Sequence, residues 1–106
     1  MARDLKRKDF EHFVAVCETG GFSEAAKKLK TAQSNVSTRI AGLERLLGAA
    51  LVERHYRKIT ITRAGRRLYW HAKQIISGFH AAENAVRAGR EARGVRKRRI
   101  QTRKSR

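Results

Sequence analysis

The spacing of apolar residues changes twice along this chain, and each change marks a boundary between elements. Up to about residue 47 the apolar residues recur at the three- and four-residue spacing of amphipathic helices. Residues 51–62 instead include Ile59 and Ile61 alternating with threonines, a period-two pattern of β-branched residues that is typical of a short strand. The helical spacing then returns. The pattern predicts three helices, a small hairpin and one long final helix.

Glycines and a polar break divide the first part of the chain into three helices. Gly20 and Gly48 end the first and third helices, because glycine readily adopts the left-handed conformation of a helix C-terminus. Ser23 is the predicted N-cap of the second helix. Ala25 and Ala26 leave room for another helix to approach it closely. The first predicted helix runs from Asp4 to about Thr19, the second opens at Phe22-Ser23 and includes Leu29, and the third runs from about Gln33 to Leu47.

The final helix, predicted from Arg63 to about Gly89 with Thr62 as its cap, carries a heptad pattern. Its apolar residues lie alternately four and three positions apart, at Leu68, Ala72, Ile75, Phe79, Ala82 and Val86. Such a pattern is typical of helices that pair in a coiled coil. A helix of about 27 residues is roughly 40 Å long, more than one small domain covers. We therefore expect a homodimer through this helix; the alternative is packing against its own domain.

The charge of the chain predicts a polyanionic partner. Its 106 residues hold 26 Lys and Arg against nine Asp and Glu, a net charge of +17. DNA, RNA and anionic membranes attract such a chain. Residues 90–106 account for +8 and have few apolar residues, so we expect a flexible basic tail or a frayed extension of the helix there, which leaves +9 for residues 1–89. A natural stand-alone chain and a truncated one remain open.

Several classes of protein are disfavoured. No apolar run is long enough to span a membrane. Cys17 is the single cysteine, so it predicts no internal disulfide and fits a cytoplasmic protein. The histidines lack the spacing of metal ligands, and no motif of a catalytic nucleophile or phosphate loop occurs. We expect no metal, no cofactor, no catalytic residues and no enzyme activity.

Three helices followed by a hairpin predict a mainly α winged helix-turn-helix, covering residues 1–62. In that fold the third helix reads base edges in the major groove with its N-terminal residues, and the hairpin presents cations to the DNA backbone. Residues 55–58 form a basic hairpin tip that fits the second role. The candidate DNA-binding residues of the third helix are Gln33, Ser34, Asn35, Ser37, Thr38 and Arg39.

Residues 10–70 also resemble the N-terminal DNA-binding domain of LysR-type transcriptional regulators. The matching stretches are FEHFVAV at 10–16, ETGGFSEAA at 18–26, AQSNVS at 32–37, LVER at 51–54 and ITRAG at 61–65, with Leu29, Ile40, Leu43, Glu44, Leu47 and Gly48 at the expected places. The resemblance implies a winged helix-turn-helix followed by a dimerising linker helix over residues 63–89.

The resemblance also implies roles for single residues. Gln33, Ser34 and Ser37 match positions that face DNA at the start of the recognition helix. Arg57, next to Lys58, matches a wing arginine that often enters the minor groove. In the same family a serine at the position of Ser23 often touches phosphate.

The sequence departs from the family in three places. Thr38 stands where the family usually has arginine, with Arg39 directly after it, and Ala32 stands where serine is frequent. The chain also ends where an effector-binding domain would begin, so we expect that domain to be absent and higher oligomers only in a longer form.

These observations predict a domain that binds double-stranded DNA sequence-specifically as a dimer, on an operator with dyad symmetry. Such a protein acts at the bacterial nucleoid in the cytoplasm. The alternative from the same charge and fold is an architectural protein that binds DNA without sequence preference.

Overall fold

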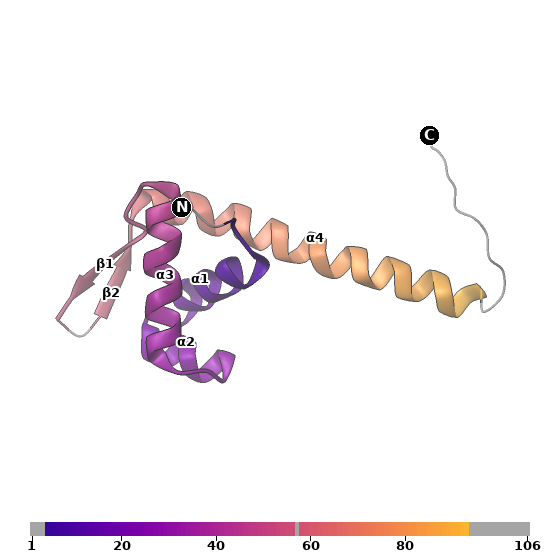
Figure 1. Ribbon diagram of the computed structural model, residues 1–106, viewed down its shortest axis with the longest axis horizontal. Coiled ribbons are helices and arrows are strands. Elements are labelled where there is room, and N and C mark those ends of the chain that lie inside the picture. The colour runs from indigo at the N-terminus through magenta and orange to yellow at the C-terminus, as the bar shows by residue number, and fades with distance from the viewer. Residues whose placement is uncertain (1–3, 57, 94–106) are drawn as a thin grey trace. The chain divides into compact units, whose positions relative to one another are not determined.

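The computed structural model describes residues 4–56 and 58–93, and there it contains four helices and one hairpin in the predicted order (Figure 1). The elements are α1 (Arg7–Thr19), α2 (Phe22–Leu29), α3 (Gln33–Leu47), β1 (Val52–His55), β2 (Lys58–Ile61) and α4 (Arg63–Arg93). The mainly α fold with a two-stranded antiparallel wing is therefore confirmed. The chain divides into two units after Ile76, within α4.

The predicted start of the first helix and the predicted N-cap of the second helix were wrong. α1 begins at Arg7 because the Asp9 carboxylate accepts a hydrogen bond from the Lys6 backbone N–H at 2.7 Å, which makes Lys6 the N-cap. α2 begins at Phe22, one residue before the predicted cap, because Gly21 is the last residue with extended backbone. Ser23 therefore lies exposed in the first turn of α2 and does not cap it.

The helix ends follow the predicted backbone chemistry. Gly20 and Gly48 both have positive φ, 85° and 69°, and end α1 and α3 in the left-handed conformation. α2 ends the same way at Lys30, with φ 57°, which is strained for a residue that has a Cβ. The turn between α2 and α3 is thus held in one geometry, with Thr31 donating its backbone N–H to the Ala26 carbonyl at 3.0 Å.

The core lies among α1, α2, α3 and the start of β1. Its most deeply buried apolar residues, each under 2% exposed, include Phe13, Val16, Ala25, Val36, Ile40, Leu43 and Leu51. Ala26 is 5% exposed, so the paired alanines do form a close contact surface as predicted. Leu47 was predicted on the apolar face of α3 but is 42% exposed, because it lies in the last turn of that helix.

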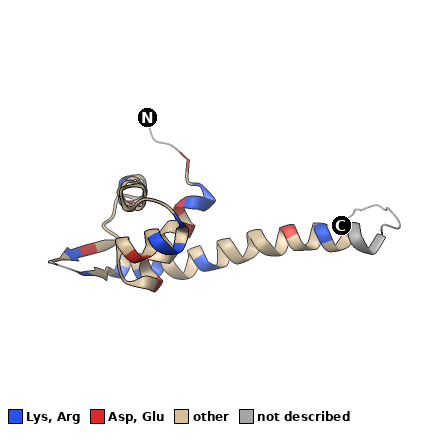
Figure 2. Cartoon of the chain, turned by 90° about the horizontal axis from the view of Figure 1, so that it is seen from below, with Lys and Arg blue, Asp and Glu red and all other residues tan. Residues whose placement is uncertain are grey.

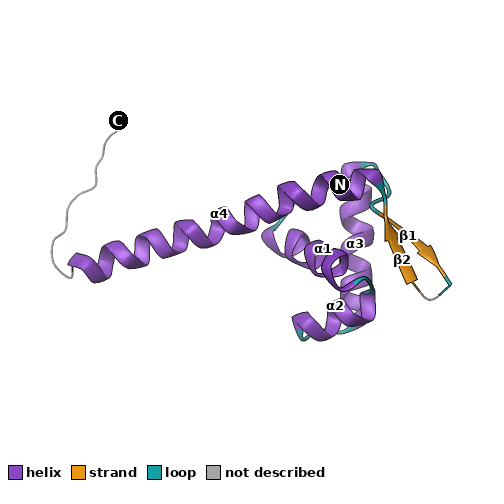
Figure 3. Cartoon of the chain, turned by 180° about the vertical axis from the view of Figure 1, so that it is seen from behind, coloured by secondary structure: helices purple, strands orange, loops and turns teal. Residues whose placement is uncertain are grey.

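Glu44 of α3 fixes where the hairpin starts. Its Oε2 accepts the backbone N–H of Leu51 at 2.8 Å and that of Val52 at 3.2 Å. β1 then pairs with β2 in antiparallel register, from Val52 opposite Ile61 to His55 opposite Lys58 (Figure 3). Because one side chain holds the first residues of the strand, the wing has a defined place beside the third helix.

The start of α4 is capped as predicted, and its first turns pack against α1. Thr62 Oγ1 accepts the Gly65 N–H at 3.0 Å. Ala72 is fully buried against Phe10 and Val14 of α1. The helix runs through Arg93 instead of ending near Gly89, since an interior glycine weakens a helix without stopping it. Residues 94–106 of the predicted tail lie outside the described residues.

A polar contact reinforces this packing. Glu18 at the end of α1 accepts hydrogen bonds from the Tyr69 hydroxyl at 2.7 Å and from Lys73 at 3.0 Å. The hydrogen bond from Tyr69, followed by the one from Lys73, lowers the pKa of the Glu18 carboxyl. α1 and α4 are therefore joined by the apolar contact of Ala72 and by the ionised carboxylate of Glu18.

Gly65→Ala is expected to destabilise the fold, by about 1–3 kcal/mol, because an added Cβ would collide with the backbone carbonyl of Leu51 and lie 2.7 Å from Ile61 Cγ2. Urea unfolding measures the change. Gly78→Ala in the same helix is the matched control: it meets nothing within 4 Å and should leave stability equal or slightly higher. Equal effects of the two substitutions would contradict the close approach.

Candidate nucleic-acid interface

The N-terminal half of α3 presents an exposed polar surface. The side chains of Gln33, Ser34, Asn35 and Thr38 are exposed, and Ser37 is half-buried. Ala32, the N-cap, provides no side-chain hydrogen bond, so the first turn is not closed off by a capping group. Asn35 donates its amide to the Thr31 hydroxyl at 2.8 Å. Short donors and acceptors therefore face solvent over this part of the helix, as the sequence predicted.

The wing lies along one flank of α3. Arg54 of β1 donates to Ser37 Oγ at 3.3 Å, and its guanidinium lies 4.4 Å from the centre of the Phe22 ring. Arg54 is not among the DNA-binding residues predicted from the sequence. The period-two spacing from the buried Val52 could have identified it, because residues two apart in a strand point to the same face.

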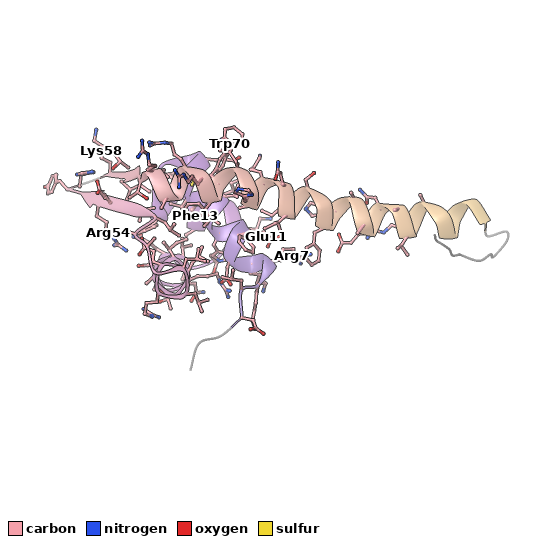
Figure 4. All side chains as sticks on the ribbon, turned by 90° about the horizontal axis from the view of Figure 1, so that it is seen from above. Arg7, Glu11, Phe13, Arg54, Lys58 and Trp70 are labelled. Carbon is pink, nitrogen blue, oxygen red and sulfur yellow. The ribbon has the colours of Figure 1, made fainter. Side chains whose placement is uncertain are left out.

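An open cleft of about 370 Å³ lies between the start of α2 and the hairpin. Ser23, Gln33 and Lys58, three of the predicted DNA-binding residues, line this cleft together with Arg54 and Tyr56. Tyr56 at the hairpin tip is 94% exposed. Figure 4 shows Arg54 and Lys58 on the hairpin. The predicted wing contact Arg57 lies outside the described residues. The fold thus gathers predicted residues from α2, α3 and β2 at one place.

Arg39 lies apart from that group. Its Nη1 donates to Asp9 Oδ1 of α1 at 3.0 Å, and the Asp9 side chain is fully buried. At about 100° per residue, Arg39 and Ser37 point in directions about 200° apart around α3. A direct contact of Arg39 with DNA stays a prediction, but its guanidinium already neutralises a buried carboxylate.

The predicted heptad residues of α4 belong to two different units of the chain, which meet after Ile76. Ala72 is fully buried within its own unit, which leaves it no exposed surface for a second copy, whereas Leu68 beside it is only partly buried and its role in a dimer stays a prediction. Ile75 is 40% exposed in the first unit. In the second unit Phe79 is 46% exposed, Val86 is 67% exposed and Ala82 is exposed as well.

Other candidate sites in the described residues are few. Burial raises the pKa of the Cys17 thiol to about 12, and the side chain packs against the core. Residues 4–56 and 58–93 contain no group of three His, Cys, Asp or Glu side chains that could hold a metal ion. In the same residues no helix combines the length and the apolar character needed to cross a bilayer.

Comparison with known families gives a match over most of the first unit. The family described as "Bacterial regulatory helix-turn-helix protein, lysR family" matches residues 7–66. An uncharacterized HTH-type transcriptional regulator of Azotobacter vinelandii is 48% identical over 74 residues, which are 70% of this chain and 51% of that protein. Two other curated relatives are matched over 26% and 32% of their length, so the chain spans about half or less of these relatives.

Two solved structures of DNA complexes are similar to the chain. One is the BenM DBD with catB site 1 DNA, with a TM-score of 0.77 and 32% identity, covering 80% of this chain and 94% of that one. The other is a CbnR DBD–DNA complex, with a TM-score of 0.77 and 30% identity, covering 80% of this chain and 98% of that one.

Arg39→Ala should lower the free energy of unfolding by about 3 kcal/mol, because it removes the Arg39 guanidinium that pairs with the fully buried Asp9 carboxylate. Urea unfolding at neutral pH measures the loss. Thr38→Ala, at the adjacent exposed position, should change stability by no more than about 0.5 kcal/mol. Similar values for the two variants would show that the ion pair contributes no stability.

Proposed function

The chain belongs to the LysR family of bacterial regulatory helix-turn-helix proteins, and from this premise we propose that it is the DNA-reading part of a transcriptional regulator. One observation carries the proposal: exposed polar side chains at the start of α3 lie beside a hairpin whose Arg54 and Lys58 share a cleft with Gln33. The two similar DNA complexes support double-stranded DNA as the partner.

α3 reads the bases from the major groove. The Gln33 side chain can donate to and accept from one adenine edge, and the Ser34 hydroxyl can bond to any base. Arg54 holds the Ser37 hydroxyl from the side of the wing, so this hydroxyl is oriented before DNA arrives. Since these groups are short and lie at one end of the helix, they reach only a few base pairs in each half-site.

The cleft between α2 and the hairpin binds the phosphate backbone. Ser23 lies in the first turn of α2, where free backbone N–H groups favour an anion. Lys58 adds a cation from the wing, and Arg57 is proposed to reach the minor groove beyond it. Figure 2 marks basic residues along the hairpin. Phosphate contacts of this kind fix the register of α3 without reading sequence.

The exposed apolar side chains of α4 pair two copies of the chain. Ile75, Phe79, Ala82 and Val86 keep the heptad spacing, and the large side chains of Phe79 and Val86 are 46% and 67% exposed. Two paired chains present two copies of α3, so the operator has dyad symmetry. Residues 1–62 then read DNA, residues 63–89 pair, and the regulator acts at the nucleoid; further oligomers need an effector domain in a longer form.

In vitro selection of bound duplexes at fixed, near-physiological salt tests this function. We expect one preferred sequence with two inverted half-sites. Gln33→Ala should relax the base preference at one position per half-site, with a loss of about 1–3 kcal/mol of discrimination at each position. Lys58→Ala should weaken binding to all sequences alike. No enrichment, together with a steep salt dependence, would instead identify an architectural DNA-binding protein.

Phe79→Glu should convert the dimer to a monomer, because it places a charge within the apolar face of α4. Sedimentation velocity measures the change. Ser77→Glu adds the same charge at a position about 160° from Phe79 and about 140° from Ala82 around the helix and should leave the dimer intact. A dimer that survives Phe79→Glu would refute this pairing surface.

A further inference from the structure

A second cleft, unrelated to the wing, lies between α1 and α3 and is strongly basic. It has a volume of about 780 Å³. The N-terminus of α1 contributes Lys6 and Lys8, the turn after α2 contributes Lys30, and α3 contributes Arg45. The lining also includes polar groups of the helix-turn-helix, among them Asn35 and Thr38.

The charge of this cleft is not neutralised from within the described residues. Glu11 is the one acidic residue that lines it, and Glu11 already pairs with Arg7 at 3.3 Å. Arg39 lines the cleft too, but its charge is balanced by Asp9. Among the described side chains of residues 4–56 and 58–89, no carboxylate lies within ion-pair distance of the four remaining cations, Lys6, Lys8, Lys30 and Arg45.

The pKa of His12 reflects burial and the positive charge around this cleft. Burial lowers the pKa of His12, which lines the same cleft, and the nearby Arg39 guanidinium lowers it further. The hydrogen-bond contact of its Nδ1 with the Lys8 carbonyl, at 2.8 Å, acts in the opposite direction. Most of the charge of the cleft therefore belongs to lysine and arginine.

The position of the cleft around α3 indicates its ligand. The wing contacts α3 at Ser37, and α1 contacts it at Arg39, about 200° around the helix. Ser34, Thr38 and Arg45 point into the sector between those directions. A helix is about 10–12 Å wide and the major groove about 12 Å, so a helix in the groove has one phosphate backbone on each side.

We infer that the α1–α3 cleft binds the phosphate backbone of the DNA strand that borders the major groove on the side opposite the wing. The inference rests on the proposed function, because it requires α3 in the groove. It assigns Lys6, Lys8, Lys30 and Arg45 as backbone contacts that carry no sequence information. Two basic clefts, one on each flank of α3, then hold the helix between both strands.

Salt dependence of binding tests the assignment. Lys30→Gln/Arg45→Gln removes two cations without acids being added, and glutamine keeps the helix propensity of arginine in α3. Fluorescence anisotropy measures the affinity of this variant for the selected operator and for a scrambled duplex. We expect both affinities to be lower than those of the unsubstituted chain. The slope of log affinity against log salt should become shallower by about 2, since each phosphate contact contributes about 0.9.

The matched control is Arg67→Gln/Arg87→Gln, which removes two cations of α4 that are not among the residues lining either cleft. It should leave the slope unchanged, and thermal unfolding should report equal stability for both double variants. Lys6→Gln/Lys8→Gln gives a second measurement at the other wall of the cleft, with the same expected loss of slope.

Each outcome decides the inference. A cleft variant that binds the operator with the slope of the control would overturn it and leave the proposed function in place. Binding of inorganic phosphate that shifts the amide resonances of Lys30 and Arg45, with no change in the DNA slope, would assign the cleft to a free anion instead. An unsubstituted chain that binds no duplex would overturn both proposals.

Discussion

The contact between Asp9 and Arg39 is the interaction on which the arrangement of this domain depends. Asp9 has no exposed surface, yet its carboxylate caps the first turn of α1 and accepts a hydrogen bond from α3, thirty residues later. A buried carboxylate persists only when its partners have good geometry. The pair therefore requires one position of α3 against α1, and the exposed face of α3 follows from it.

Glu44 and Arg54 extend that constraint from α3 to the wing. Glu44 holds the backbone of the first hairpin residues, and Arg54 returns from β1 to Ser37 and to the ring of Phe22. Three polar contacts to α3 thus determine which of its faces stays open. The proposed readout uses the open face, and the two basic clefts lie on either flank of it.

Local patterns accounted for most of the fold. Features that depend on a few neighbouring residues could be predicted from the sequence. They are the glycine ends of α1 and α3, the threonine cap of α4 and the alternation of Ile59 and Ile61 with threonines. The N-cap of α2 was misplaced because Ser23 has good capping chemistry, and only the extended backbone of Gly21 determines where that helix begins.

The order of elements, the basic character and the set of polar residues on α3 could be predicted from spacing and composition, and matching stretches of residues carried the family resemblance. Which of those residues remain exposed depends on how the helices pack. Arg39 looked like a reader of bases and is held by a buried acid from another helix; Ala72 looked like part of a dimer interface and is covered by α1. Burial and pairing arise between segments distant in sequence, so no local pattern contains them.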